Sequence, residues 1–204
     1  MAKQAYFVHE PESGPLSGTL VVLWHGAGGD VDQQHIQALA KALPALGAAV
    51  VRARFPYRVA GKRAPDRMPK LIESAKARLE QLEDKLGKFE RVVLGGRSMG
   101  GRMTTMLAAE GHPVDGLILL SYPLHPAGKK DKLRDAHLPA VKAPMLFVLG
   151  SKDALCDLEL LRPVLAKLPK KRVTLDVFEG GDHGMRRVPE EDITAAVVRW
   201  LEKL

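Results

Sequence analysis

The sequence predicts a single α/β domain over residues 1–204, with a mostly parallel β-sheet that carries helices on both faces. Three observations predict this architecture. Apolar runs rich in Val, Ile and Leu recur along the chain, segments of helical periodicity separate them, and 204 residues are enough for one hydrophobic core but short for two. Strands that alternate with helices form βαβ units, so most neighbouring strands are expected to run parallel.

Six apolar runs predict buried strands, because a parallel strand covered on both faces reads as a continuous hydrophobic stretch. They occupy residues 19–24, 48–52, 91–94, 117–121, 145–149 and 173–178. Residues 6–9 are also predicted to form a strand, which adds to one edge of the sheet in antiparallel orientation.

Segments with helical spacing of apolar residues lie between these strands. Three of them place their apolar side chains on one face: Ile36, Leu39, Ala40 and Leu43; Leu71, Ala75, Leu79, Leu82 and Leu86; and Ile193, Ala196, Val197, Trp200, Leu201 and Leu204. Residues 103–109 are expected to be helical as well.

Two long stretches break the alternation, at residues 55–69 and 123–144, and each follows a predicted strand. Loops after the carboxyl ends of strands build the ligand crevice of open α/β sheets. We therefore expect both stretches to serve the function rather than to be idle connections.

The composition restricts the class of protein. No run approaches the ~20 consecutive apolar residues of a membrane span, and the first 14 residues contain no apolar signal-peptide core, so we expect a cytoplasmic protein. The formal charge of +7 comes without a nucleic-acid-binding motif, so no nucleic-acid partner is expected. The single cysteine, Cys156, allows no internal disulfide and is interpreted as a small buried residue.

A glycine-rich turn gives the strongest local signal. Residues 96–100, Gly-Arg-Ser-Met-Gly, fit the pattern G-x-S-x-G between a predicted strand and a predicted helix. A serine on so sharp a turn has a strained backbone, and the residues two positions away must be small to avoid the adjoining strand. The turn also points the hydroxyl at a helix N-terminus, where negative charge is favoured. Ser98 is therefore predicted to be a nucleophile.

A second glycine-rich segment, His25 to Asp30, follows the first parallel strand. A backbone with few side chains can approach a substrate closely, and acyl transfer needs two N–H groups aimed at the developing oxyanion. We predict that these are the N–H groups of Met99 and Ala27. His25 is interpreted as a structural residue that orients the loop. The segment lacks the spacing of dinucleotide-binding and P-loop motifs.

Two further motifs, at residues 150–153 and 181–184, follow the last two predicted strands. Asp153 is predicted to be the acid and His183 the base. Together with Ser98, each of them then follows a predicted strand, and all three meet at one edge of the sheet. Asp182 is rejected as the acid, since adjacent side chains on an extended segment point apart. Asp157 is the second contender.

On these residues the chain resembles the α/β-hydrolase superfamily, in particular its small lidless dienelactone-hydrolase-like branch. Within that branch it is similar to small bacterial relatives of the vertebrate testis-expressed hydrolase-like proteins. The resemblance covers residues 19–204 and is carried by the motifs at residues 25–29, 96–101, 121–126, 150–153 and 182–184. It implies a minimal lidless α/β-hydrolase fold. Dienelactone hydrolases proper use a cysteine where Ser98 stands, so their substrate is not carried over.

The function predicted is cleavage of an ester or thioester of a small soluble molecule through an acyl-enzyme on Ser98, with no cofactor and no metal. Two alternatives stay open. One is a non-catalytic interaction protein that kept the fold, and the other is a cofactor-free perhydrolase that uses the same three residues. Short or compact acyl groups are expected, because no segment between strands is long enough for a helical lid.

The substrate is also expected to carry negative charge. The long stretches at residues 55–69 and 123–144 are rich in Lys and Arg, and cations grouped around a cleft raise the capture rate of anions. The candidate substrate-rim residues are Arg54, Arg58, Arg97, His125 and Met185.

Overall fold

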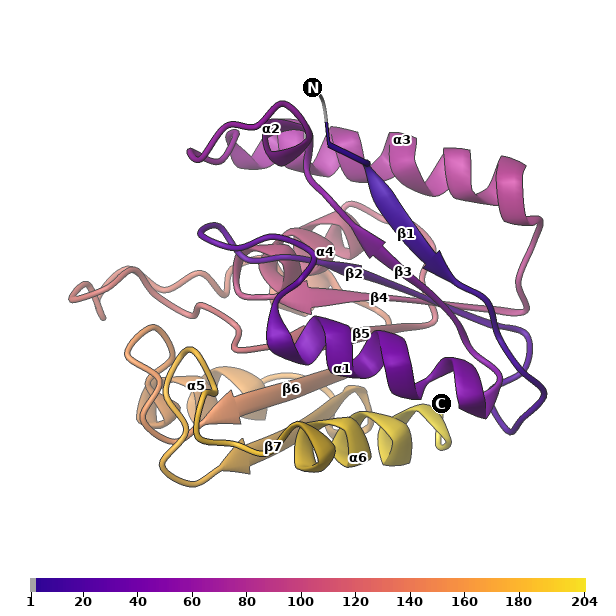
Figure 1. The fold of residues 1–204 in the computed structure, drawn as a ribbon. Coiled ribbons are helices and arrows are strands. Elements are labelled where there is room, and N and C mark those ends of the chain that lie inside the picture. Colours follow the sequence, from indigo (N-terminus) through magenta and orange to yellow (C-terminus); the bar gives the residue numbers. More distant parts are fainter. Residues whose placement is uncertain (1–2) are drawn as a thin grey trace.

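The computed structural model describes residues 3–204, which form a seven-stranded sheet between two layers of helices (Figure 1). The strand order is β1-β3-β2-β4-β5-β6-β7. The first strand pairs antiparallel with β3, and all other neighbours are parallel. The strands are β1 (Tyr6–His9), β2 (Thr19–Trp24), β3 (Ala49–Ala53), β4 (Arg91–Arg97), β5 (Gly116–Leu120), β6 (Met145–Gly150) and β7 (Val173–Phe178). The predicted fold class is confirmed, including the antiparallel edge strand.

The helices divide between the two faces of the sheet (Figure 1). One face is covered by α1 (Gln34–Ala42) and α6 (Glu190–Leu201), which also contact each other. The other is covered by α3 (Met68–Leu86), α4 (Met99–Ala109) and α5 (Leu158–Ala166). Shorter pieces are α2 (Pro56–Val59) and the 3-10 turns η1 (Pro44–Leu46), η2 (Leu138–Ala140) and η3 (Lys170–Arg172).

The central strands are buried on both faces. Successive residues of β2 alternate between two core clusters: Val21 packs with α1 and α6, and Val22 packs on the side of α3 and α4. Every residue of β2, β5 and β6 is buried. This double burial explains why these strands appear in the sequence as unbroken apolar runs rather than as alternating patterns.

The structure departs from the predicted elements in the segments that follow β3 and β6. Residues 55–69 include helix α2 and the first residues of α3, so this stretch is less irregular than expected. Helix α5 was not predicted, and Pro163 lies inside it. The stretch 123–144 contains only the 3-10 turn η2. The helix inserted after β3, α2, has only four residues.

The order of the strands places a crevice at the carboxyl ends of β2 and β4. The chain passes from β2 to β3 on one side and then returns to β4 on the other, which is where open α/β sheets bind their ligands. Trp24, the last residue of β2, is paired with Gly96 of β4, so the segments that follow these two strands start side by side. No helix within residues 3–204 combines the length and the apolar character that crossing a membrane requires.

Candidate active site

Ser98 lies on the sharp turn between β4 and α4. Its backbone has φ 52° and ψ −111°, a conformation that costs a non-glycine residue of order 1–3 kcal/mol and persists only when the surroundings impose it. Two hydrogen bonds impose it here. The Ser98 N–H donates to the Leu120 carbonyl at 2.8 Å, and the Ser98 carbonyl accepts from the Arg102 N–H at 3.0 Å.

The glycines on either side of Ser98 have the steric role that the motif predicts. A Cβ atom on Gly96 or on Gly100 would collide with the backbone carbonyl of Trp24 at the end of β2. A larger residue at either position would therefore have to displace the backbone of the central strand β2, which is costly.

The structure brings Ser98, His183 and Asp153 into one hydrogen-bonded chain. His183 Nε2 lies 3.0 Å from Ser98 Oγ, and His183 Nδ1 lies 2.9 Å from both carboxylate oxygens of Asp153. The Asp153 side chain is fully buried, while that of His183 is 23% exposed. A carboxylate only accepts hydrogen bonds, so Nδ1 carries the proton and Nε2 is left to accept from the serine hydroxyl.

Backbone contacts explain why the acid and the base meet. Gly150, at the end of β6, lies so close to Gly181 that a Cβ atom on it would collide with the Gly181 backbone. The Lys152 N–H donates to the Gly181 carbonyl at 2.8 Å, and Ser151 Oγ accepts from the Gly180 N–H at 2.9 Å. These contacts join the two motifs that carry Asp153 and His183.

The other two candidate acids have different partners. Asp182 pairs with Arg186 at 3.1 Å, and its side chain is 43% exposed. Asp157 is the N-cap of α5, where it accepts from the Glu159 N–H, and it also binds Lys130. Neither has a hydrogen bond to His183, so the geometry favours the predicted assignment of Asp153, which stays a prediction until it is tested.

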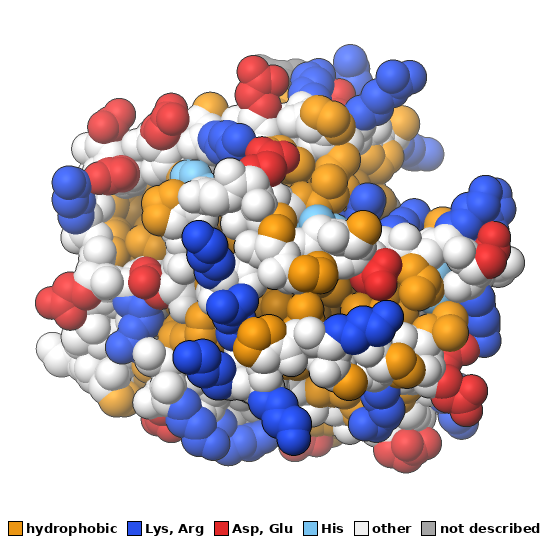
Figure 2. All heavy atoms as spheres, turned by 180° about the vertical axis from the view of Figure 1, so that it is seen from behind, with side chains coloured by type: hydrophobic (Ala, Val, Ile, Leu, Met, Phe, Trp, Pro, Cys, Tyr) orange, Lys and Arg blue, Asp and Glu red, His pale blue; other side chains and the backbone are white. Residues whose placement is uncertain are grey.

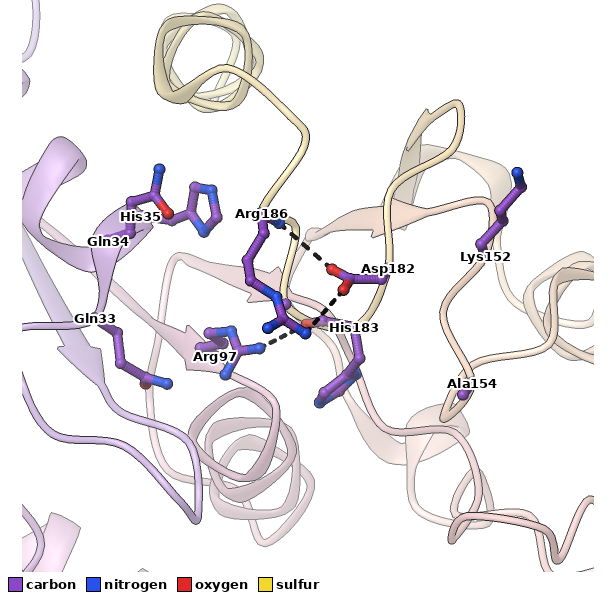
Figure 3. A pocket seen from close by; sticks show the side chains of 10 residues that line it. Gln33, Gln34, His35, Arg97, Lys152, Ala154, Asp182, His183 and Arg186 are labelled. Atoms are coloured by element: carbon purple, nitrogen blue, oxygen red, sulfur yellow. Dashed lines mark hydrogen bonds and ion pairs between the residues drawn. The ribbon is translucent and has the colours of Figure 1, made fainter.

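Arg97 supports the base from a position that sequence reasoning did not foresee. Its Nη2 donates to the backbone carbonyl of His183 at 2.6 Å, and burial lowers the pKa of its guanidinium. Figure 3 shows Arg97, Asp182, His183 and Arg186 converging in a hollow of about 520 Å³. Arg97 was predicted to be a substrate-rim residue. It lines this hollow but not the cavity that contains Ser98.

The two predicted oxyanion-hole donors lie in the expected segments. Met99 is the first residue of α4, where an N–H has no acceptor within the helix. Ala27 is exposed in the segment after β2, and its carbonyl accepts from the Tyr57 hydroxyl at 3.0 Å. Among residues 3–204, neither N–H has a hydrogen-bond acceptor, so both remain available to a ligand oxygen.

His25 holds the oxyanion segment in place and is fully buried. Its Nε2 accepts from the Phe55 N–H at 3.2 Å, and its Nδ1 lies 2.9 Å from the Gly26 carbonyl. Burial lowers the pKa of His25, which keeps the ring neutral with the proton on Nδ1. These contacts bear out the interpretation of His25 as a structural residue.

Two of the predicted rim residues instead belong to an ion cluster around Asp30. Arg54 is only 8% exposed and donates to Asp30 at 2.5 Å, and Arg58 lies 3.5 Å from the same carboxylate. Burial alone would raise the pKa of Asp30, but hydrogen bonds led by that from Arg54 hold it at about 2. The rim prediction for Arg54 and Arg58 is wrong, because sequence spacing could not show that Asp30 pairs with them.

The predictions for His125 and Met185 are also wrong. His125 is 1% exposed, accepts from the Asp157 N–H at 3.2 Å, and lines a different hollow that includes Asp153. Met185 is 2% exposed and packs in the core beside α6. Cys156 is buried as interpreted, and burial raises the pKa of its thiol to about 12, so it is not a thiolate.

A cavity of about 340 Å³ opens onto Ser98. It contains both predicted oxyanion residues, and both long stretches contribute to its wall, as expected. The lining residues are Ala27, Asp66, Met68, Leu71, Ser98, Met99, Arg102, Pro123, Arg134 and Leu155. Arg102 was missed by sequence reasoning, which considered cations in loops and next to the motifs but not those inside helices.

Comparison with known proteins gives one family. Residues 17–199 match the family described as alpha/beta hydrolase domain. Among solved structures, Est1E from Butyrivibrio proteoclasticus with ferulic acid bound is 20% identical, with a TM-score of 0.81 over 97% of this chain and 94% of that one.

Two other solved structures, described as a serine hydrolase homologue and a serine hydrolase, are also similar. An alpha-beta serine hydrolase homologue from Coxiella burnetii is 23% identical, with a TM-score of 0.78 over 98% of this chain and 96% of that one. An α/β serine hydrolase without a lid from Xanthomonas campestris is 23% identical, with a TM-score of 0.76 over 96% and 88%. At these identities the likeness establishes the fold, whereas the chemistry has to be argued from the site.

Proposed function

The chain belongs to the alpha/beta hydrolase family, and from that membership and the geometry around Ser98 we propose that it is a serine hydrolase that cleaves an ester or thioester of a small molecule. One observation carries the proposal. Ser98 Oγ, His183 and Asp153 are joined by hydrogen bonds of 3.0 and 2.9 Å, next to a cavity lined by Ala27 and Met99, whose backbone N–H groups have no acceptor among residues 3–204.

In the proposed reaction, Ser98 Oγ attacks the carbonyl carbon while His183 Nε2 takes the hydroxyl proton. Asp153 keeps the Nδ1 proton in place and stabilises the imidazolium that forms. The N–H groups of Met99 and Ala27 stabilise the oxyanion. His183 then gives its proton to the departing alkoxide or thiolate, and a water molecule activated by the same imidazole releases the acid from Ser98.

The surroundings support a catalytic rather than an idle serine. The strained backbone at Ser98 costs free energy, as does burying the full carboxylate of Asp153. A non-catalytic interaction protein would gain nothing from a strained serine and a buried carboxylate that are both aligned with a histidine. The alternative of perhydrolysis by the same residues remains an outcome of the assay below.

The test measures hydrolysis of small activated esters and thioesters by the wild type and by Ser98→Ala. In the wild type we expect a burst in which each enzyme molecule releases one molecule of alcohol, or of thiol from a thioester. In the variant we expect a loss of kcat/KM of at least ~10³-fold. Hydrogen peroxide is included as an alternative acyl acceptor in one arm.

Ser121→Ala is the matched control. Ser121 directly follows the neighbouring strand β5, has the same φ of 52°, is fully buried, and has a hydroxyl without a hydrogen-bond partner among residues 3–204. It does not line the Ser98 cavity, so its variant should keep most of the activity. Equal activity of Ser98→Ala and wild type would reject the proposed function.

A further inference from the structure

Two arginines that have no side-chain partner among residues 3–204 stand in the wall of the Ser98 cavity. We propose that Arg102 and Arg134 select substrates that carry an oxyanion group, a carboxylate or a phosphate, in addition to the bond that is cleaved. This inference rests on the proposed function and names its substrate class. Arg134 belongs to the cation-rich stretch 123–144 that the sequence predicted at the rim, whereas Arg102 lies outside the predicted rim.

Both arginines are fixed beside the nucleophile by their backbones. The Arg102 N–H donates to the Ser98 carbonyl at 3.0 Å, which holds the first turn of α4, with Arg102, against the residue that precedes the helix. Arg134 comes from the loop after β5. Its N–H donates to the Leu124 carbonyl at 2.7 Å, and its carbonyl accepts from the Tyr122 hydroxyl at 2.6 Å.

Neither guanidinium has a hydrogen-bond or ion-pair partner among residues 3–204, although both side chains are half-buried. The Nε atom of Arg102 is buried and unbonded. Each other buried or half-buried arginine of the described chain has a partner: Arg52, Arg54, Arg58, Arg78, Arg91, Arg97 and Arg172. The exception is therefore confined to the cavity that contains the nucleophile.

The local charge balance is positive. Among the described lining residues Asp66 is the one acid, against two arginines; its Oδ1 accepts from Lys70 at 2.9 Å, and its Oδ2 is buried without a hydrogen-bond partner. Both arginines line the same cavity, and burial, followed by the charge of Arg102, lowers the pKa of Arg134. Two like charges held close together in a half-buried wall cost free energy unless an anion binds between them.

The number of cations alone would not identify a site on this basic protein. Figure 2 shows Lys and Arg side chains scattered over one whole face, with acidic side chains among them. Arg102 and Arg134 differ from these side chains in two ways: their half-buried guanidiniums have no hydrogen-bond or ion-pair partner among residues 3–204, and they line the cavity of Ser98. A guanidinium presents parallel N–H donors that match the two oxygens of a carboxylate or a phosphate.

The test compares three activated esters of similar size: 4-nitrophenyl pentanoate, the 4-nitrophenyl monoester of glutaric acid, and the 4-nitrophenyl ester of 4-phosphonobutyric acid. The quantity measured is the ratio of kcat/KM for each anionic ester to that for the pentanoate, after subtraction of the uncatalysed rate. We expect a ratio above one for at least one anion, and the larger ratio identifies the group.

Arg102→Gln and Arg134→Gln should each lower that ratio by about tenfold or more, the scale of a lost hydrogen bond to a charged group. Arg162→Gln removes the same charge from the exposed side of α5 and should keep the wild-type ratio. Arg134→Glu should reverse the preference for anionic esters and favour the cationic 4-nitrophenyl ester of a trimethylammonium butyrate. A loss of structure alone would not produce that reversal.

The outcomes separate this inference from the proposed function. Hydrolysis of all three esters with ratios near one, unchanged by Arg102→Gln and Arg134→Gln, overturns the selectivity and leaves the hydrolase standing. Failure to hydrolyse any ester, together with an unreactive Ser98, overturns the proposed function and the selectivity with it.

Discussion

Replacing Asp153 with asparagine should shift the ring proton of His183 from Nδ1 to Nε2. The Leu155 N–H donates to Asp153 Oδ1 at 2.8 Å, so the oxygen of an asparagine would turn to that donor. Its NH₂ group would then occupy the Oδ2 position, 2.9 Å from His183 Nδ1. Because Nδ1 is equally close to the oxygen position, the amide presents it with a donor beside an acceptor. When Nδ1 accepts from the NH₂ group, the ring proton moves to Nε2, where it blocks acceptance from Ser98 Oγ.

The expected loss of kcat/KM is ~10³–10⁴-fold, the scale seen when a buried triad carboxylate becomes an amide. That corresponds to about 4–5.5 kcal/mol of transition-state stabilisation. The assay is steady-state hydrolysis of a short activated ester, with thermal unfolding as the check that the variant folds.

Asp182→Asn is the control for this experiment. It removes a carboxylate from the residue beside His183, but that side chain is 43% exposed and pairs with Arg186. We expect activity close to that of the wild type. The reasoning is refuted if Asp182→Asn is the crippled variant and Asp153→Asn is not.

Four further predictions test separate parts of the structure. Arg97→Met removes the 2.6 Å hydrogen bond to the His183 carbonyl and should lower kcat/KM by about tenfold through a misplaced imidazole, whereas unchanged kinetics would show that the base needs no such support. Gly100→Ala sets a Cβ against the Trp24 carbonyl and should lower the free energy of unfolding in urea by about 1–3 kcal/mol. Gly28→Ala, with no atom within 4 Å of the new Cβ, should change it little. Equal effects of the two substitutions would contradict the steric account. Burial, and then the charge of Arg102, lowers the pKa of His137 from 6.5 to about 4. Between these pH values the unfolded chain binds a proton on His137 that the folded chain does not, so the free energy of unfolding should fall as the pH drops from about 6.5 to 4. The fall should be shallower in His137→Gln. Because the Ser98 cavity is about 340 Å³ and has charged walls, activity on esters of two- to twelve-carbon acids should favour the short ones, and a steady rise with chain length would oppose this.

Much of the fold could be predicted because the central strands are buried on both faces. Runs such as residues 19–24 and 145–149 have no polar interruption, and the strands there match the predictions closely. Helix α5 escaped prediction because Pro163 lies inside it, although Asp157 as N-cap before the apolar residues Leu158 and Leu161 was a usable signal.

The candidate site was predictable where backbone geometry dictates the residue type. Gly96 and Gly100 are required by the Trp24 carbonyl, so the nucleophile motif is visible in the sequence. The rim was not predictable, because the role of an arginine depends on which acid folding brings to it. Arg54 pairs with Asp30, whereas Arg102 pairs with no acid in the described part of the chain, and nothing in the local sequence separates the two.

The most direct test of the central claim is covalent labelling of the native protein with a fluorophosphonate, followed by peptide mapping. A fluorophosphonate reacts with a serine whose hydroxyl is activated by a base, so the natural substrate need not be known. We predict a single adduct on Ser98, absent in Ser98→Ala and formed much more slowly in Asp153→Asn. An adduct on any other serine, or none on the folded wild type, would contradict the account.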